Sequence, residues 1–247
     1  RAWKIKKYID KMFVIFPFEQ DFYKNYDYEV KYVGNPLVDE IEKKKVNLSE
    51  KSEFIRNNEL SEKPIIALLA GSRKQEIHLI LPEMLHMVKQ YPDYQFIIAG
   101  APSFNQLDYS AYIKGLDVKV VFKQTYDLLK HAHAAIVTSG TATLETALFN
   151  IPQVVVYKMV QLQYDIGKFF IKVKFFSLVN IILDREIVKE LLQNNLAEKI
   201  KKELDRILTD DAYRHRMLEN YKLLKTKLGN EGASRRTAEE IVNELKK

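Results

Sequence analysis

Short apolar runs rich in β-branched residues alternate with helical patterns, and this alternation limits the fold more than any other feature of the sequence. Residues 65–69, 95–99, 118–122, 134–137 and 153–157 are typical of strands. Between several of these runs, apolar residues recur every three or four positions, as on a helix with one buried face. Strands joined by helices over short connections form βαβ units. We therefore predict an α/β fold with a Rossmann-like, doubly wound parallel sheet.

The two ends of the chain show other patterns. Beyond Ile187 the sequence predicts only helices up to the C-terminus. Residues 1–36 open without a methionine and end at an Asn-Pro turn, and we expect them to be the remnant of a preceding lobe. The lysine-rich stretch 37–63 predicts an exposed helix and linker. Residues 64–247 then form the main domain together with its C-terminal helices.

Composition narrows the classes of function. The 247 residues carry 39 Lys and Arg against 33 Asp and Glu, and this net charge of +6 favours acidic partners such as phosphates, nucleic acid or anionic lipid. The basic residues form no nucleic-acid-binding motif, so we discount nucleic acid. The absence of cysteine excludes disulfide and thiolate chemistry and suits a reducing compartment. No apolar run approaches the roughly 18 residues of a membrane span.

The first predicted strand runs into a turn that suits a phosphate. Gly71 allows close approach of the backbone, and the N-terminus of the following helix offers N–H groups and a positive dipole. Next to it, Arg73 adds a planar, permanently charged donor. The same residues are also compatible with a simple tight turn in which Ser72 caps the helix and Arg73 is solvated.

A second strand-to-helix turn carries small residues and hydroxyls, from Ser139 through Gly140, Thr141 and Ala142 to Thr143. Backbone N–H groups and hydroxyls at a helix start can converge on an anion. Glu145 lies about one turn into the helix, and its carboxylate could accept hydrogen bonds from ribose hydroxyls, since helical side chains lean toward the N-terminus. The alternative is a well-capped helix on which that glutamate, Glu145, points outward.

Five segments of the chain resemble lipid-A-disaccharide synthase, and together they cover nearly its whole length. They read MFVIFPFE from Met12, GNP from Gly34, LLAGSRKQEI from Leu68, TSGTATLETALFNIPQVVVYK from Thr138 and SLVNIILDREIVKELLQ from Ser177. The last two are the most specific. The match corresponds to the C-terminal two-thirds of the family. It implies a GT-B architecture of two facing Rossmann-like lobes, with this chain supplying the lobe that binds the UDP-sugar.

The resemblance implies a glycosyltransferase of lipid A biosynthesis. Such an enzyme transfers 2,3-diacylglucosamine from its UDP donor to lipid X, which is 2,3-diacylglucosamine 1-phosphate, and releases lipid A disaccharide 1-phosphate and UDP. The family uses no cofactor and no metal. The implied partners are UDP-diacylglucosamine, lipid X and an anionic membrane, and a homodimer stays open. The implied location is the cytoplasmic, inner face of the bacterial inner membrane, as a peripheral protein.

The resemblance also implies roles for the residues of the two turns. The UDP diphosphate would lie near Gly71, Ser72 and Arg73 and at the helix start formed by residues 139–143. The ribose would be bound by Glu145. Arg73 is the expected catalytic residue, because its charge would neutralise the negative charge that develops on the departing UDP.

Three further residues are implied to contact the donor. Backbone groups near Phe122 would face uracil. Asn180 and Arg185 are expected in a polar loop between the lobes, where they would contact the donor sugar or the leaving phosphate.

One departure from the family concerns the first lobe, which should hold the acceptor site and the catalytic base. Only its last strand, ending near Phe18 and Glu19, has a counterpart here. The chain could therefore be a UDP-binding or dimerisation module that is inactive by itself. A UDP-N-acetylglucosamine 2-epimerase or a peptidoglycan glycosyltransferase would share the lobe geometry, but the segment from Ser177 argues against both.

One pair of histidines gives weak support for a metal site. His131 and His133 form a His-x-His pair, which could supply two metal ligands. No third ligand cluster lies nearby in the sequence. We therefore expect structural or surface roles for this pair and no metal site.

A stretch at residues 164–176 predicts a basic amphipathic helix. Phe169 and Phe170 fall on its apolar face, and Lys168 and Lys172 share another face. Such a helix can lie in a membrane interface and attract anionic lipid. It can equally pack against the core with its lysines solvated.

Overall fold

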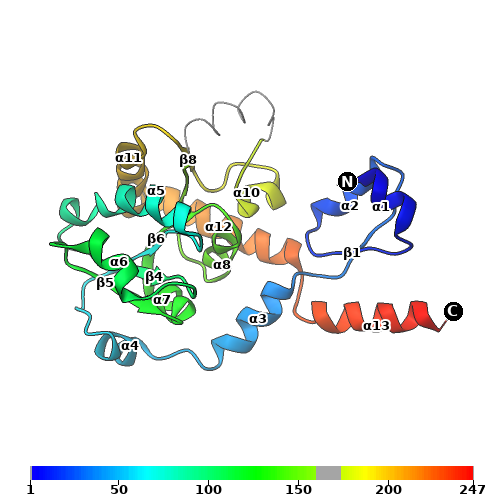
Figure 1. The fold of residues 1–247 in the computed structure, drawn as a ribbon, viewed down its shortest axis with the longest axis horizontal. Helices are drawn as coiled ribbons and strands as arrows, with labels where there is room; N and C mark the ends of the chain where they lie inside the picture. Colours follow the sequence, from blue (N-terminus) through cyan, green and yellow to red (C-terminus); the bar gives the residue numbers. More distant parts are fainter. Residues whose placement is uncertain (1, 160–173, 247) are drawn as a thin grey trace. The chain divides into compact units, whose positions relative to one another are not determined.

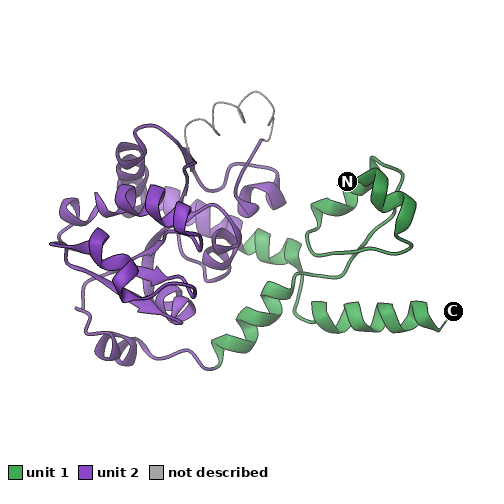
Figure 2. Cartoon of the chain, in the orientation of Figure 1, with its two compact units in different colours: residues 1–46, 222–247 green, residues 47–221 purple. Residues whose placement is uncertain are grey.

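The computed structural model describes residues 2–159 and 174–246. The chain divides into two compact units: one holds residues 1–46 and 222–247, and the other holds residues 47–221 (Figure 2). This division differs from the predicted boundaries, because the last stretch of the chain groups with the first 46 residues and not with the sheet.

Six parallel strands form the sheet of the second unit, in the order β5-β4-β3-β6-β7-β8 (Figure 1). Their bounds are β3 (Ile65–Leu69), β4 (Gln95–Gly100), β5 (Val118–Phe122), β6 (Ala132–Thr138), β7 (Gln153–Tyr157) and β8 (Glu190–Leu192). The predicted α/β class with a parallel sheet is confirmed, and all five predicted strands of this unit are present.

Helices connect these strands and cover the sheet. They are α4 (Lys51–Asn57), α5 (Lys74–Leu85), α6 (Gln106–Ile113), α7 (Thr125–His131), α8 (Thr141–Leu148), α10 (Leu178–Leu183) and α11 (Leu196–Thr209), with a short 3-10 turn at Val88–Gln90. The long helix α12 (Asp211–Leu228) begins in this unit. All five residues of β3 are buried, as expected for a central parallel strand covered on both faces.

The prediction that the chain is entirely helical beyond Ile187 is wrong. Strand β8 pairs in parallel with β7 and extends the sheet by one strand. It has only three residues and begins with a glutamate, Glu190. Neither an apolar run nor an alternating pattern is long enough there to indicate a strand.

The first unit contains a pair of short parallel strands and several helices. Its elements are α1 (Ala2–Tyr8), β1 (Phe13–Val14), α2 (Phe18–Lys24), β2 (Lys31–Tyr32), α3 (Pro36–Lys45) and α13 (Ala233–Leu245). Asp39 of α3 caps α13, because its carboxylate accepts hydrogen bonds from the backbone N–H groups of Gly232, Ala233 and Ser234. This cap joins segments that lie about 190 positions apart in the sequence.

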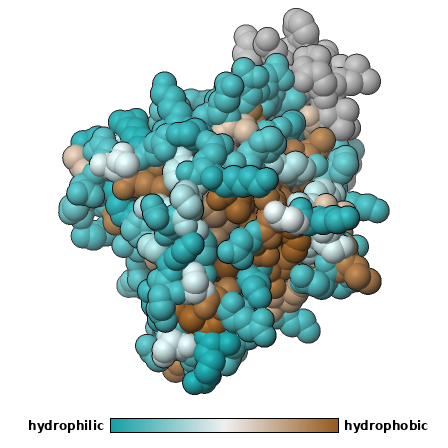
Figure 3. Space-filling view, turned by 90° about the vertical axis from the view of Figure 1, so that its left-hand side faces the viewer, coloured by the Kyte–Doolittle hydropathy of each residue, from teal (hydrophilic) through white to brown (hydrophobic). Residues whose placement is uncertain are grey.

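Hydrophilic side chains dominate the face of the molecule shown in Figure 3, where they surround a smaller hydrophobic area. Within the ranges that the structure describes, no helix is both long and apolar enough to cross a membrane.

Candidate functional site

The strand order of the sheet reverses between β3 and β6. From β3 the chain builds outward on one side through β4 and β5, and it then continues on the other side through β6, β7 and β8. Strands β3 and β6 pair directly, and Leu69 lies opposite Val137 at their carboxyl ends. The two turns predicted to bind phosphate therefore start side by side. They lie at the edge where open parallel sheets bind ligands.

A glutamate of its own helix closes the first turn. The carboxylate of Glu76 accepts hydrogen bonds from the backbone N–H groups of Ser72, at 3.0 Å, and Arg73, at 3.2 Å. Its other oxygen lies 3.2 Å from Nη1 of Arg73. Gly71 has φ +102°, and a Cβ there would lie 2.8 Å from the Cβ of Glu76. Glycine is thus required both by the backbone conformation and by the close approach of Glu76.

This arrangement places a negative charge at the N-terminus of α5, where an anionic ligand was expected. A phosphate approaching Ser72 and Arg73 would meet the carboxylate of Glu76. The side chain of Arg73 is 82% exposed. Exposed ion pairs of this kind contribute little, about 0–1 kcal/mol, so Arg73 can exchange one anion for another at low cost.

The second turn has no such cap. Gly140 precedes α8 with φ 156° and ψ −161°, a conformation adopted almost only by glycine. No side chain caps the helix in the part of the chain that the structure describes. The first N–H groups of an α-helix lack intrahelical acceptors, so those of Gly140, Thr141 and Ala142 form the open end of α8. Gly140 and Thr141 are exposed.

Two hydroxyls of this turn, those of Ser139 and Thr143, donate to backbone carbonyls. Ser139 donates from Oγ to the carbonyl oxygen of Phe176 at 2.8 Å. Thr143 is fully buried and donates from Oγ1 to the carbonyl oxygen of Gly140 at 2.8 Å. These bonds shape the turn. Whether either hydroxyl also contacts a ligand stays a prediction.

Glu145 is oriented by a tyrosine of the neighbouring helix. Tyr126, in α7, donates from its hydroxyl to Oε1 of Glu145 at 2.9 Å. The ring of Tyr126 is 9% exposed and packs against Phe149, with the ring centroids 5.2 Å apart. A buried ring thus holds the carboxylate that was predicted to bind ribose.

Phe122 ends β5, two strands away from β3 at the same edge of the sheet. Its ring packs edge-on against Tyr109, with the centroids 5.9 Å apart. Gly100 lies opposite Phe122 in the register, and a Cβ on Gly100 would overlap this ring. The ring therefore belongs to the packing at the end of β5, while the predicted contact between its backbone and uracil stays a prediction.

The prediction that Asn180 lies in a polar loop is wrong. Asn180 lies within α10 and is 0% exposed. Its Oδ1 accepts from the N–H groups of Ile187 and Val188, and its Nδ2 donates to the carbonyl of Val188 and the carboxylate of Glu190. A contact with the donor sugar would require this amide to give up one of those bonds. The sequence pattern missed this because the partners of Asn180 lie on a different element.

Arg185 lies in the loop after α10, as predicted. It is exposed, and its Nη2 donates to Oδ1 of Asn220 in α12. Its expected contact with the donor remains a prediction.

The four residues predicted to face a membrane, Phe169, Phe170, Lys168 and Lys172, lie outside the described residues. The stretch just after them is described: Lys174 forms an ion pair with Asp184 at 2.9 Å.

Both histidines of the His-x-His pair take part in packing. A ring nitrogen of His131 lies 2.9 Å from the carbonyl oxygen of Ser49, and its ring lies against Phe54. His133 lies against Tyr94, and burial together with nearby Arg214 lowers its pKa. The described ranges contain no group of three or more His, Cys, Asp or Glu residues that could hold a metal ion.

Comparison with known proteins identifies the family. The family model for lipid-A-disaccharide synthetase matches residues 1–244. The chain belongs to this family. It is 36% identical over 253 residues to lipid-A-disaccharide synthase of Syntrophotalea carbinolica and 34% identical over 255 residues to that of Geobacter sulfurreducens. These matches cover 99% and 100% of the chain, but only 63% and 65% of the two relatives.

The fold is shared with other proteins that handle UDP-sugars. The structure of UDP-GlcNAc 2-epimerase from Neisseria meningitidis bound to UDP-GlcNAc matches 98% of the chain and 67% of that protein, with a TM-score of 0.65 and 14% identity. At this identity the likeness shows the fold alone, which is that of the GT-B type.

Sequence reasoning missed three side chains that form hydrogen bonds with the predicted site residues or their neighbours, namely Glu76, Tyr126 and Glu190. Glu76 had a local signal, since a Glu at the third position of a helix typically reaches back to the N–H groups before it. Tyr126 and Glu190 had none, because their partners lie 10 to 19 positions away on other elements.

Proposed function

We propose that the chain is the donor-binding part of a glycosyltransferase that moves 2,3-diacylglucosamine from UDP to lipid X and releases lipid A disaccharide 1-phosphate and UDP. The observation that carries this proposal is the uncapped N-terminus of α8, which lies at the point where the strand order reverses. Family membership supports the class of reaction.

In this proposal the diphosphate of UDP lies at the open end of α8. The N–H groups of Gly140, Thr141 and Ala142 donate to its oxygens, and the helix dipole favours its charge. Glu145 lies one turn further along the same helix, and its carboxylate accepts from the ribose hydroxyls while Tyr126 holds it. The spacing along one helix matches the order of diphosphate and ribose in UDP.

Arg73 is the proposed catalytic residue. When the acceptor oxygen bonds to C1 of the donor sugar, the bond from C1 to the phosphate oxygen breaks and UDP leaves with the electron pair. The exposed guanidinium of Arg73 can turn from Glu76 to this new negative charge. Such stabilisation acts mainly on the transition state and therefore on turnover.

The chain spans 63% and 65% of the length of the two curated relatives named above. We therefore also propose a second candidate function for the chain by itself: it binds UDP without catalysing transfer. The base that takes the acceptor's proton is expected in the remaining part. An epimerase activity is supported only by likeness of fold, whereas the family model favours the transferase.

The acceptor and donor of this reaction carry acyl chains. We propose that the whole enzyme works as a peripheral protein at the cytoplasmic face of the inner membrane. The net charge of +6 supports attraction to anionic lipid.

Calorimetric titration of the 247-residue chain with UDP and ADP tests the proposal. We expect saturable binding with a preference for UDP. Glu145→Ala should weaken UDP binding roughly 10- to 100-fold, the scale of lost hydrogen bonds to a charged group. Glu198→Ala, which removes the same charge from an exposed position of α11, should change it less than about twofold. Equal affinity of Glu145→Ala and the parent would remove Glu145 from the site.

A further inference from the structure

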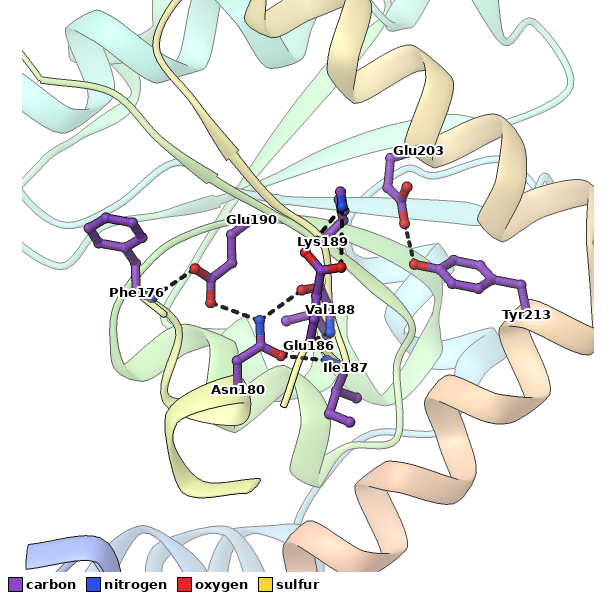
Figure 4. A network of polar contacts seen from close by, with 9 residues as sticks. All are labelled: Phe176, Asn180, Glu186, Ile187, Val188, Lys189, Glu190, Glu203 and Tyr213. Carbon is purple, nitrogen blue, oxygen red and sulfur yellow. Dashed lines mark hydrogen bonds and ion pairs between the residues drawn. The ribbon is translucent and has the colours of Figure 1, made fainter. Parts of the chain in front are cut away.

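A carboxylate at the start of β8 is surrounded by N–H donors. Glu190 accepts hydrogen bonds from the backbone N–H of Phe176 at 2.7 Å and from Nδ2 of Asn180 at 2.8 Å (Figure 4). It also accepts one from the backbone N–H of Ser177 at 2.9 Å. Among the described residues it has no ion-pair partner. The neighbouring Lys189 pairs instead with Glu186. The charge of Glu190 is therefore balanced by oriented N–H groups.

The amide of Asn180 holds this carboxylate in place. Asn180 is completely buried in α10, and its amide bonds both to Glu190 and to the backbone of Ile187 and Val188, just before β8. Figure 4 shows the amide between the carboxylate and that backbone. Because every hydrogen-bonding position of the amide is used toward fixed groups, Glu190 has little freedom to move.

One peptide group connects Glu190 with the second turn. The carbonyl of Phe176 and the N–H of Ser177 belong to the same peptide unit. Its N–H donates to Glu190, and its carbonyl accepts from the hydroxyl of Ser139 at 2.8 Å. Hydrogen bonds on both sides of a peptide unit polarise and strengthen one another. The carboxylate thus orients the carbonyl that holds Ser139.

Ser139 is anchored at two points. Its backbone N–H donates to the carbonyl of Val156, and its hydroxyl donates its one proton to the carbonyl oxygen of Phe176. Its own carbonyl leads directly to Gly140, whose N–H begins the open end of α8. The position of Ser139 therefore sets where that end begins.

We propose that Glu190 is a positioning residue for the phosphate-binding turn. Through the Phe176–Ser177 peptide and Ser139, it holds the N–H groups at the start of α8 in the geometry that receives the diphosphate. This inference rests on the proposed function for its ligand. It also changes the role of Ser139, which fixes the turn and does not donate to the phosphate.

A merely structural role for Glu190 makes a different prediction. If Glu190 only stabilised α10 and β8, its loss would lower the melting temperature and leave the UDP affinity of the folded chain unchanged. If Glu190 acts through Ser139, changing both residues should lower the UDP affinity by less than the product of the two single fold-changes.

The experiment is a double-mutant cycle in the 247-residue chain, with Glu190→Gln, Ser139→Ala and the double variant, each titrated with UDP well below its melting temperature. We expect each single variant to weaken UDP binding roughly five- to tenfold. The double variant should bind UDP about as well as the single variant with the lower affinity. The matched control is Glu186→Gln, an exposed position four residues earlier, which should stay within about twofold.

Hydrogen exchange of the backbone amides of Ser139 and Thr143, which donate to the carbonyls of Val156 and Gly140, gives a readout that needs no UDP. Glu190→Gln should speed their exchange, and Glu186→Gln should not. Glu190→Asp, which keeps the charge but is one methylene shorter, replaces Glu190→Gln if that variant does not fold. UDP affinity and exchange both equal to the parent, or effects that multiply, would overturn the positioning role. A parent chain that fails to bind UDP while the exchange result holds would instead refute the proposed ligand.

Discussion

The two turns at the carboxyl edge of the sheet begin side by side, yet their helices start in opposite ways. At α5, the third helical residue is Glu76, and its carboxylate occupies the N–H groups of Ser72 and Arg73. At α8, the same helical position is Thr143, which is fully buried and turns its hydroxyl to the carbonyl of Gly140. The first helix start carries its own anion, whereas the second has no carboxylate on it among the residues that the structure describes.

A glycine-containing turn before a helix can thus have its N–H groups closed by a carboxylate of the same helix, as at α5, or left without a side-chain cap, as at α8. Both turns have glycine in a conformation that other residues disfavour, and both follow a buried parallel strand. What separates them is the side chain three positions into the helix. A third helix start, that of α13, is closed by Asp39 from another helix. Among the residues that the structure describes, α8 is the one of these three helix starts with no carboxylate bonded to it.

The largest expected effect comes from closing the open turn. Thr141→Asp places a carboxylate at the first, exposed position of α8. The variant should be as stable as the parent or more stable, by about 0.3–1 kcal/mol, because the carboxylate complements the helix dipole. UDP binding should weaken at least roughly 30-fold, since two negative charges would share the site. Calorimetry and thermal unfolding measure the two effects.

The matched control for that variant is Gln106→Asp, at the first, exposed position of α6. It should stabilise its helix similarly and leave UDP binding within about twofold. Equal loss of UDP affinity in both variants would indicate a general charge effect and not a site at α8.

Much of this comparison was accessible from the sequence. Strands β3 to β7 were predicted because their sequences read as short β-branched runs, as is typical of parallel strands in a sheet covered by helices. The two turns and their place in the sheet followed from the strand-helix alternation. The three-residue strand β8 and the buried state of Asn180 did not, because each depends on partners in other elements.

The site shows the same limit. Residues 139–143 were predicted to bind phosphate from their local composition alone. That Ser139 is tied to Phe176, and that Glu145 is held by Tyr126, depends on contacts between segments 37 and 19 positions apart. A single sequence predicts which residues line an edge of a sheet more readily than which side chains hold one another there.

A moderate effect should come from loosening Glu145. Tyr126→Phe removes the hydroxyl that donates to Glu145 and keeps the buried ring against Phe149. UDP affinity should fall roughly fivefold, the scale of one hydrogen bond to a charged group. The preference for UDP over 2′-deoxy-UDP should shrink by a similar factor. An unchanged preference, measured by competition titration, would show that Tyr126 does not act through a ribose contact.

A smaller effect, of opposite sign, should come from opening the closed turn. Glu76→Gln removes the negative charge beside Arg73 and keeps the size of the side chain. UDP binding should tighten by roughly two- to threefold, because Arg73 is no longer paired with a carboxylate. If calorimetry showed instead that UDP binding is lost, Glu76 would itself be part of the site and the comparison between the two turns would fail.

The smallest effect concerns the cap at the start of α13. Changing this cap should alter the stability of the chain at low pH and leave its affinity for UDP unchanged. Burial raises the pKa of Asp39, but N–H groups of Ser234, Gly232 and Ala233 lower it by more, so its pKa lies below the ordinary value. A depressed carboxyl pKa adds stability above the unfolded pKa of about 4, and this stability is lost as the pH falls through the folded pKa. Asp39→Asn should therefore flatten the pH dependence of unfolding below about pH 4.

Trp3 is the sole tryptophan and lies in the first unit, so its fluorescence reports the urea unfolding of that unit. A variant whose unfolding free energy still falls as steeply as the parent's toward low pH would show that the Asp39 cap is not the titrating group. UDP affinity at neutral pH serves as the internal control and should equal that of the parent.

The most direct test of the difference between the turns is to follow the backbone amide signals of the 247-residue chain by NMR during a titration with UDP. We expect Gly140, Thr141 and Ala142 to show the largest saturable shifts, while Ser72 and Arg73, already bonded to Glu76, shift little. Saturable shifts concentrated at Ser72 and Arg73, with residues 140–142 unmoved, would contradict it.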